Sequence, residues 1–227
     1  MLTMRFREIQ VCARSGLPFD RQRAVNVAAL HSVQEILTLW LRAHDERAPF
    51  RKFVVSLTDQ RSAGARAGHV GLMLSVCVAT EVVDLSTLEA RTDDNRWVCG
   101  LVLVALGRAS DRLGWRSEPF ERFVAEVAER EWPLVHLFEK LERVDRASKQ
   151  RFVPFFSSRP GQNRYGVRIS AEGGGSRDVV VVSKSDPIWD EDFPMAKSAL
   201  RYGQFLLLAK DGTTLAKVAL DEGLVPE

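Results

Sequence analysis

An acidic cluster around one tryptophan contains the residue types most suited to chemistry in this sequence. Asp186, Asp190, Glu191 and Asp192 surround Trp189 in a loop bounded by prolines. Carboxylate oxygens can hold a divalent metal ion, but the spacing is not that of an EF-hand. A solvated loop after a strand and a partner-binding surface are the two other interpretations. Because tryptophan is enriched among residues that anchor protein interfaces, we take these five residues as a candidate partner-binding site and predict no metal.

Two glycine-rich stretches could hold a phosphate. The triplet in "AEGGGSR", residues 171–177, is followed by a run of valines, whereas a phosphate loop needs a helix at that point. The triplet therefore predicts a hairpin turn. The stretch "GARAGHVG", residues 64–71, follows an expected strand, and Arg61 and Arg66 would be its anion contacts. Its spacing is not that of a dinucleotide-binding loop, and we predict no cofactor.

A third stretch, "RFVPFFSSR", mixes aromatic rings with arginines. Arg151, Phe155 and Arg159 are spaced along it, and Phe152 and Phe156 add two further rings. Platforms that stack single-stranded nucleic acid combine these residue types. A loop that packs its phenylalanines under a sheet has the same composition. We therefore keep Arg151, Phe155 and Arg159 as candidate anion or nucleic-acid contacts.

Motifs for zinc and for nucleophilic catalysis are missing from the sequence. There is no H-E-x-x-H, no Cys-x-x-Cys pair and no G-x-S-x-G. We expect structural roles for His31 and His136, which lie within two expected helices. Enzymatic activity stays open, because many active sites are assembled from scattered residues, but the sequence favours a protein that is not an enzyme.

Cysteine usage and the N-terminal sequence indicate a compartment. Three widely spaced cysteines do not form a disulfide framework in a chain of this length, which is typical of a reducing cytoplasm. The N-terminal stretch has charged residues where a signal peptide needs an apolar core. No apolar run approaches the roughly 18 residues of a membrane span. We expect a cytoplasmic protein of bacterial type, with no membrane contact.

Composition and charge limit the class of partner. The 227 residues are 45% hydrophobic, which is enough for a sizeable core in one large domain or two small ones. The net charge is only +2 and the pI is about 8.5. Dedicated nucleic-acid binders usually exceed a pI of roughly 9. A nucleic-acid partner is therefore possible but not favoured by composition.

Hydrophobic periodicity predicts the elements of residues 1–150. Apolar residues recur three and four apart over 21–46, which indicates a helix, and a β-branched run over 50–58 indicates a strand. The run 72–85 is a buried strand or, alternatively, a buried helix. Further helices are expected over 93–108, opened by Thr92 or Asp93, and over 118–150, capped by Ser117 and kinked at Pro133.

The composition changes at residue 151. Prolines and glycines over 151–166 indicate a linker or surface loop, followed by a hairpin through residues 165–185. Asp211 and Gly212 favour a second hairpin, with a helix over 213–222 as the alternative. We therefore predict an α+β fold with long helices and a few strands in 1–150 and an antiparallel hairpin sheet in 151–227, as two subdomains or one packed domain.

The function that these observations favour is protein binding, as in a toxin-neutralising immunity protein or an accessory subunit of a larger complex. The globular composition, the missing catalytic motifs and the tryptophan of the acidic loop support it. A nucleic-acid-binding or nucleic-acid-processing protein that uses arginine-rich surfaces is the first alternative. A small-molecule enzyme without a recognisable motif is the second. The oligomeric state is not predicted.

Overall fold

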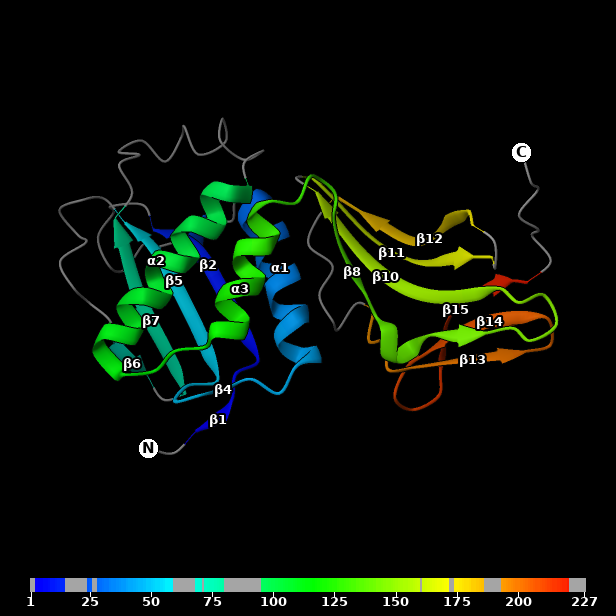
Figure 1. Ribbon diagram of the computed structural model, residues 1–227, viewed down its shortest axis with the longest axis horizontal. Coiled ribbons are helices and arrows are strands. Elements are labelled where there is room, and N and C mark those ends of the chain that lie inside the picture. Colours follow the sequence, from blue (N-terminus) through cyan, green and yellow to red (C-terminus); the bar gives the residue numbers. More distant parts are fainter. Residues whose placement is uncertain are drawn as a thin grey trace. The chain divides into compact units, whose positions relative to one another are not determined.

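A computed structural model of the chain describes residues 3–14, 24–25, 28–58, 68–70, 72–79, 95–159, 161–171, 174–185 and 193–220. The chain divides into two compact units, Met1–Leu134 and Val135–Glu227 (Figure 1). Helices and strands are both present, which confirms the mixed α and β class. The strands are not confined to the C-terminal third, and the expectation of long helices is not confirmed.

A mixed sheet forms the centre of the first unit. In their order across the sheet, its strands are β3 (Ala24–Val25), β2 (Glu8–Arg14), β5 (Lys52–Thr58), β7 (Met73–Ala79) and β6 (Gly68–Val70). β2, β5 and β7 run parallel, and β3 and β6 pair antiparallel at the margins. The short strands β1 (Met4–Arg5) and β4 (Arg47–Ala48) pair with each other. The strands expected over 50–58 and from residue 72 are thus confirmed.

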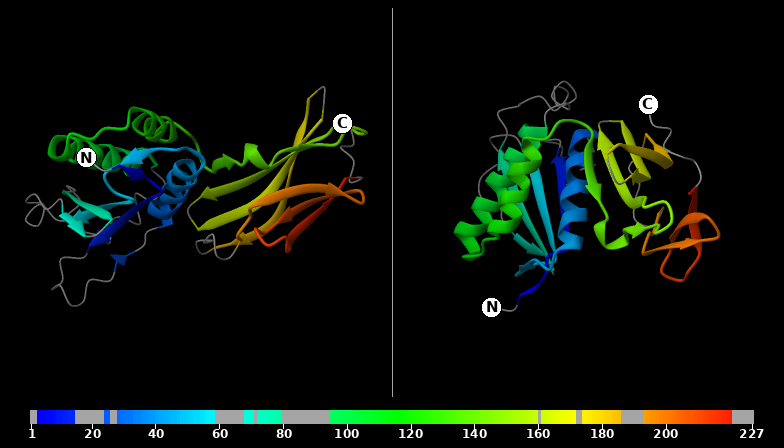
Figure 2. Two further views of the ribbon diagram at one scale, coloured as in Figure 1. Left: turned by 90° about the horizontal axis from the view of Figure 1, so that it is seen from below. Right: turned by 45° about the vertical axis from the view of Figure 1, so that its right-hand side comes forward.

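Three helices pack on this sheet: α1 (Ala28–Ala43), α2 (Asn95–Leu113) and α3 (Glu118–Ala128). α2 and α3 lie side by side, and α2 packs over β5 and β7 (Figure 2). A row of buried apolar residues, Ile9, Phe53 and Leu74, crosses the sheet in register. The expected cap of α3 is confirmed, because the Ser117 hydroxyl accepts a hydrogen bond from Phe120 N.

α1 satisfies backbone groups of β2 with its own side chains. The Thr38 hydroxyl accepts a hydrogen bond from Ile9 N and donates one to Ile9 O, both at 3.3 Å. The Gln34 side-chain oxygen accepts a hydrogen bond from Val11 N at 3.1 Å. β3 pairs only with the end of β2, at Ala13 and Arg14. Helix side chains therefore take the place of a neighbouring strand along the rest of β2, which protects an otherwise open edge.

The second unit consists of two antiparallel sheets. The larger contains, in order, β12 (Ser176–Lys184), β11 (Gln162–Ser170), β10 (Arg151–Arg159) and β8 (Leu134–Leu137), and β9 (Arg143–Val144) also pairs with β10. The 3₁₀ helix η3 (Glu139–Leu141) lies between β8 and β9 in the chain. The smaller sheet contains β13 (Lys197–Arg201), β14 (Gln204–Leu208) and β15 (Thr214–Ala219).

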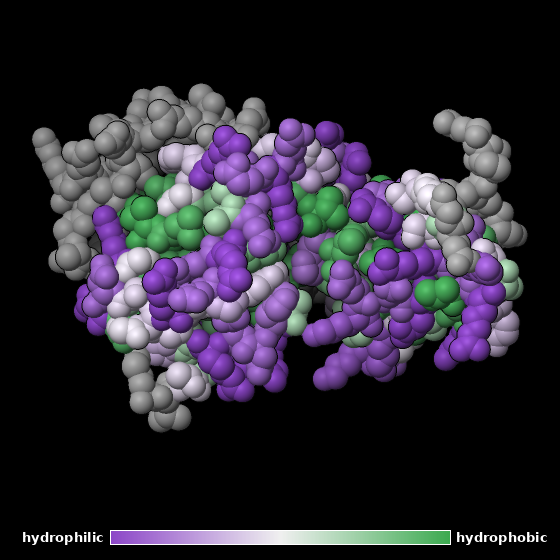
Figure 3. All heavy atoms as spheres, viewed as in Figure 1, coloured by the Kyte–Doolittle hydropathy of each residue, from purple (hydrophilic) through white to green (hydrophobic). Residues whose placement is uncertain are grey.

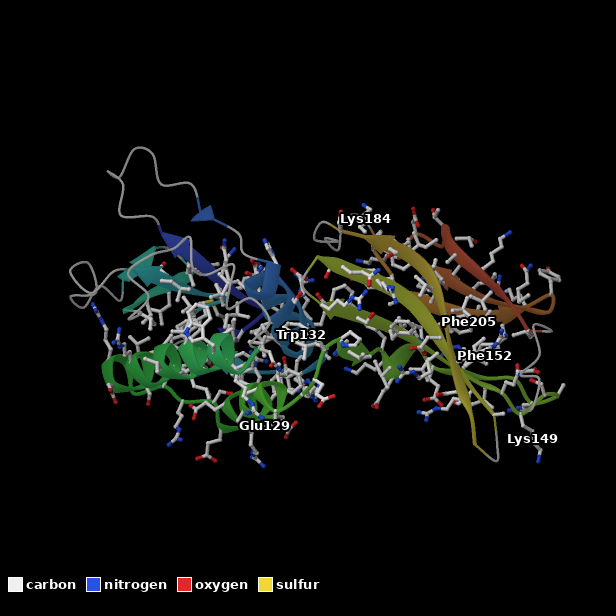
Figure 4. All side chains as sticks on the ribbon, turned by 90° about the horizontal axis from the view of Figure 1, so that it is seen from above. Glu129, Trp132, Lys149, Phe152, Lys184 and Phe205 are labelled. Carbon is white, nitrogen blue, oxygen red and sulfur yellow. The ribbon has the colours of Figure 1, made fainter. Side chains whose placement is uncertain are left out.

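Aromatic side chains join the two sheets of this unit. Phe152 on β10 and Phe205 on β14 stack with their ring centroids 5.4 Å apart, and Figure 4 shows the two side chains next to each other. Alternation along the strands places on the same inner face Pro154, Phe156, Tyr165, Val167 and Ile169. The opposite face of β10 and β11 therefore points away from the smaller sheet.

The helix expected over residues 118–150 is wrong beyond Ala128. α3 ends there, and β8, η3 and β9 follow, so that His136 lies on a strand and not on a helix. Residues 129–150 have a polar pattern that is compatible with a helix, but pairing with β10 decides their structure. β10 supplies backbone hydrogen-bond partners, for example Pro154 O, which accepts a bond from Phe138 N. Tertiary pairing of this kind leaves little trace in the local sequence.

The linker expected over 151–166 is also wrong. β10 is buried along almost its whole length, and it pairs with β11 from Arg151 to Arg159. Pro154 and Gly166 lie inside strands, and Gly161 has a φ of 73° in the turn between β10 and β11. Both expected hairpins are confirmed, the first as β11 and β12 and the second as β14 and β15. Residues 214–219 are therefore a strand and not a helix.

Candidate anion-binding face

Four arginines share the outward face of the larger sheet in the second unit. Arg151 and Arg159 occupy the two ends of β10, on the face opposite to Phe152. Arg164 and Arg168 occupy alternate positions of β11 on that same face, opposite Ser157 and Val153. A nine-residue strand spans roughly 26 Å between its end residues. We call this set of four residues the arginine face.

Two of these arginines are neutralised by carboxylates of the same unit. Arg168 forms a two-point ion pair with Asp178 on β12, with Nε to Oδ1 at 2.8 Å and Nη2 to Oδ2 at 2.9 Å. The Arg151 guanidinium lies 2.6 Å from Glu142. Hydrogen bonding to these carboxylates raises the pKa of both arginines further above their ordinary value. Both guanidinium groups are thus engaged within the fold.

The phenylalanine of the face is enclosed and not presented to a ligand. Phe155 is 2% exposed, and its ring lies over Gly166, where an added Cβ would come within 2.6 Å of the ring. The guanidinium carbon of Arg168 lies over this ring, 5.8 Å from its centroid, which is a cation–π contact. The glycine makes room for the ring, and the ion-paired arginine covers it. This ring is therefore used for packing.

Arg159 and Arg164 differ from the other two arginines. Within the described residues, neither makes an ion pair. Arg159 lies opposite Gln162, and Arg164 lies between Ser157 on β10 and Ser183 on β12. This register makes the two arginines diagonal neighbours, roughly 7–8 Å apart at the backbone. Two like charges at that separation repel each other, and an anion bound between them relieves the repulsion.

Beside the arginine face, β12 presents an apolar edge. Among the residues that the structure describes, β12 pairs with β11 alone. Its Val180 is 44% exposed, on the same face as Asp178. In Figure 3, hydrophilic residues cover most of the visible described surface of this unit, with small hydrophobic patches between them. Arginine next to exposed apolar residues is a composition found in protein interfaces.

The structure brings together only part of the predicted site residues. Arg151, Phe155 and Arg159 lie on one face of β10, with Phe155 buried between the two arginines. The remaining predicted contacts lie outside the described residues: Arg61, Arg66, Asp186, Trp189, Asp190, Glu191 and Asp192. Sequence reasoning missed Arg164 and Arg168. Their alternation in "QNRYGVRIS" was the available signal, since alternate residues of a strand share a face.

Among the described residues, no group of three or more His, Cys, Asp or Glu side chains is placed to hold a metal ion. No described helix has the length and apolarity needed to cross a bilayer. Burial lowers the pKa of His31 and raises the pKa of Glu35 to about 7, both on α1. Cys99 on α2 is buried and forms no disulfide.

Comparison with known proteins finds no matching family model, no matching curated protein and no matching solved structure. The function is therefore inferred from the geometry of the described residues.

Proposed function

We propose that this chain is a protein-binding module, such as an immunity protein or an accessory subunit, whose arginine face binds an acidic protein partner. The observation that carries the proposal is the contrast between the four arginines. Arg151 and Arg168 each have a carboxylate partner, whereas Arg159 and Arg164 have none among the described residues. Two carboxylates of a partner protein would match these two diagonal guanidinium groups in charge and in hydrogen-bonding geometry.

Three features favour a protein over a nucleic acid as this partner. The face carries two guanidinium groups without a carboxylate partner among the described residues, which is fewer cations than nucleic-acid binders usually place against a phosphate backbone. Phe155 is enclosed, so no ring of the face is free to stack on a base. The exposed Val180 beside the face adds apolar area, which suits a protein interface better than a polyanion.

A substitution on β12 tests the proposal by supplying the missing carboxylate internally. Ser183 lies opposite Arg164 in the register, as Asp178 lies opposite Arg168. Ser183→Asp places an acidic side chain where it can pair with the half-buried Arg164, and position 183 itself is exposed. We expect this variant to fold normally and to lose the partner, because the partner's carboxylate now competes with an intramolecular one.

The matched control is Ser176→Asp, which makes the same change of charge on the same strand. Ser176 lies opposite Ser170, at the other end of β12 from Arg164. Affinity capture from the source cells, with quantitative mass spectrometry, compares the two variants with the unaltered chain. A partner retained by the unaltered chain and by Ser176→Asp, but lost by Ser183→Asp, supports the proposal. Equal retention or equal loss by the two variants contradicts it.

Nucleic-acid binding remains the second candidate, and the distribution of the four arginines along the length of β10 and β11 favours it. In that case, the logarithm of the affinity for a labelled single strand falls linearly with the logarithm of the salt concentration. Arg159→Gln and Arg164→Gln each reduce the slope by roughly one. Binding that does not change between low and moderate salt removes this candidate.

A further inference from the structure

Helix α2 is apolar on the side that it exposes as well as on the side that it buries. Its residues 97–107 carry no charged side chain, and a helix that is apolar all round is normally enclosed. α2 packs on β5 and β7 and contacts α1 and α3, and its buried residues include Val98, Val102 and Ala105. In Figure 3, hydrophobic residues come to the surface where α2 crosses the sheet.

The side of α2 opposite to these buried residues has an uneven profile. Gly100, Val104 and Gly107 follow one another at spacings of four and three, so they lie on one line along the helix. Val104 is 49% exposed, whereas a Cβ added at either glycine would meet no atom within 4 Å. A branched side chain therefore stands between two positions where no side chain covers the helix backbone. We call the line formed by Trp97, Gly100, Val104, Gly107 and Asp111 the α2 face.

The profile of the α2 face is complementary to itself. When two α2 helices pack antiparallel, Val104 of one copy can lie against Gly100 of the other, and a two-fold axis repeats the contact. The same register places the half-buried Trp97 opposite Gly107. Large side chains opposite glycines allow two helices to approach closely and to fill the space between them.

The charges at the two ends of α2 suit the same arrangement. Asp111 lies in the last turn, where a carboxylate is disfavoured by the dipole of its own helix, and it forms no ion pair with another described residue. Arg96 lies in the first turn and pairs with Glu129 on α3 at 2.9 Å, in a salt bridge whose two side chains are largely exposed. Antiparallel packing brings Asp111 of each copy to the N-terminal end of the other copy's helix, near its Arg96.

We propose that the α2 face is a self-association surface, through which two copies of this chain pair antiparallel about a two-fold axis. One face of this 19-residue helix buries less than the roughly 800 Å² per partner of a standard interface. The expected dimer is therefore weak, with a dissociation constant on the order of micromolar. The surface belongs to the first unit and is independent of the arginine face, so its failure would leave the proposed function untouched.

Sedimentation velocity of the full chain at about 2 to 200 μM, a range that brackets such a constant, tests this surface. The average mass is expected to rise with concentration from that of one 25.5 kDa chain towards twice that value. Gly107→Leu is expected to weaken the dimer about tenfold or more, because the new side chain holds the helices apart. It should also raise the unfolding temperature by about 1–4 °C, since leucine favours a helix more than glycine does. A face that associates only because it is apolar would do so more strongly after this substitution.

A charge variant and a matched apolar control complete the test. Asp111→Arg is expected to weaken the dimer about threefold or more by facing Arg96 of the second copy, while the fold is kept because a cation suits the last turn of α2. Ala125→Leu adds apolar bulk at an exposed position of α3 and is expected to change nothing. The proposal is overturned if the unaltered chain stays monomeric over this range, if Gly107→Leu or Asp111→Arg associates as strongly as the unaltered chain, or if Ala125→Leu weakens association as much as they do.

Discussion

Glu35 on α1 gives the first unit a pH-dependent stability that one substitution should remove. Burial raises the pKa of its carboxyl group to about 7, from an ordinary value of 4.5. The charge of Arg42 lowers this pKa, and the charge of Glu8 raises it. The ionised form is therefore disfavoured in the folded chain relative to the unfolded chain. Glu35→Gln keeps the size and polarity of the side chain and removes the ionisation.

The magnitude follows from the difference between the folded and unfolded pKa values. The folded state binds the Glu35 proton more tightly, so this group favours folding at low pH and opposes it as the pH rises. The penalty is absent well below pH 4.5, grows between pH 4.5 and 7, and is complete above pH 7. A pKa difference of about 2.5 corresponds to about 3 kcal/mol at most. Glu35→Gln should thus stabilise the chain at pH 8 by up to about 3 kcal/mol and by less than about 1 kcal/mol at pH 5.

Urea unfolding at pH 5, 6, 7 and 8, followed by tryptophan fluorescence, measures this effect. Four of the five tryptophans, at positions 40, 97, 115 and 132, fall in the first unit, so the signal reports mainly on the unit that contains Glu35. Glu131→Gln, which removes an exposed carboxylate, is the control. A difference between Glu35→Gln and the unaltered chain that is the same at pH 5 and pH 8 would refute the reasoning.

Four further substitutions probe packing, helix propensity and buried hydrogen bonds, and chemical denaturation measures each. Gly166→Ala should destabilise the second unit by about 2–4 kcal/mol, because its Cβ would lie 2.5 Å from a β12 carbonyl oxygen; Gly107→Ala, in open space on α2, should instead stabilise by about 0.5–1 kcal/mol. Thr38→Val should cost about 1–3 kcal/mol, because Ile9 loses both hydrogen bonds. Ser117→Ala should cost about 1 kcal/mol through loss of the α3 cap.

Elements with a strong local signal could be predicted from the sequence. β5 is a short run with β-branched residues, and α3 begins where a serine precedes a proline by two positions. The turn at Asp211 and Gly212 joins β14 to β15, with Gly212 at a φ of 94°. In each case, the residues that decide the conformation are neighbours in the chain, so a window of the sequence contains the information.

Elements decided by distant partners could not be predicted. The segment 134–144 carries charged residues at helical spacing, yet it becomes β8, η3 and β9 because β10 offers backbone partners. In β10 itself, Pro154 and the nearby glycines suggested a linker. Pro154 is accommodated because it contributes its carbonyl oxygen, and not an N–H group, to the hydrogen bond with Phe138 N. Gly166 in β11 is required by the ring of Phe155 and not by a turn.

The candidate site was predictable only in part for the same reason. The sequence draws attention to Arg151, Phe155 and Arg159 as a local mixture of rings and cations. The structure adds Arg164 and Arg168 to the same face through the register of β10 and β11. Whether Arg164 or Arg168 is available to a ligand depends on which residue β12 places opposite it. That register is a property of the folded sheet.

A β-bulge in β12 determines the surroundings of Arg164. The register shifts between Tyr165 and Gly166, so that Val180 pairs with Gly166, Val182 pairs with Tyr165, and Val181 is the additional residue. Without the extra residue, Val182 and not Ser183 would lie opposite Arg164. A bulge also twists an edge strand and interrupts its row of backbone groups, which hinders the addition of a foreign strand. The bulge therefore favours docking on the arginine face over docking along the edge of β12, and it gives Arg164 a small hydroxyl neighbour in place of a bulky apolar one.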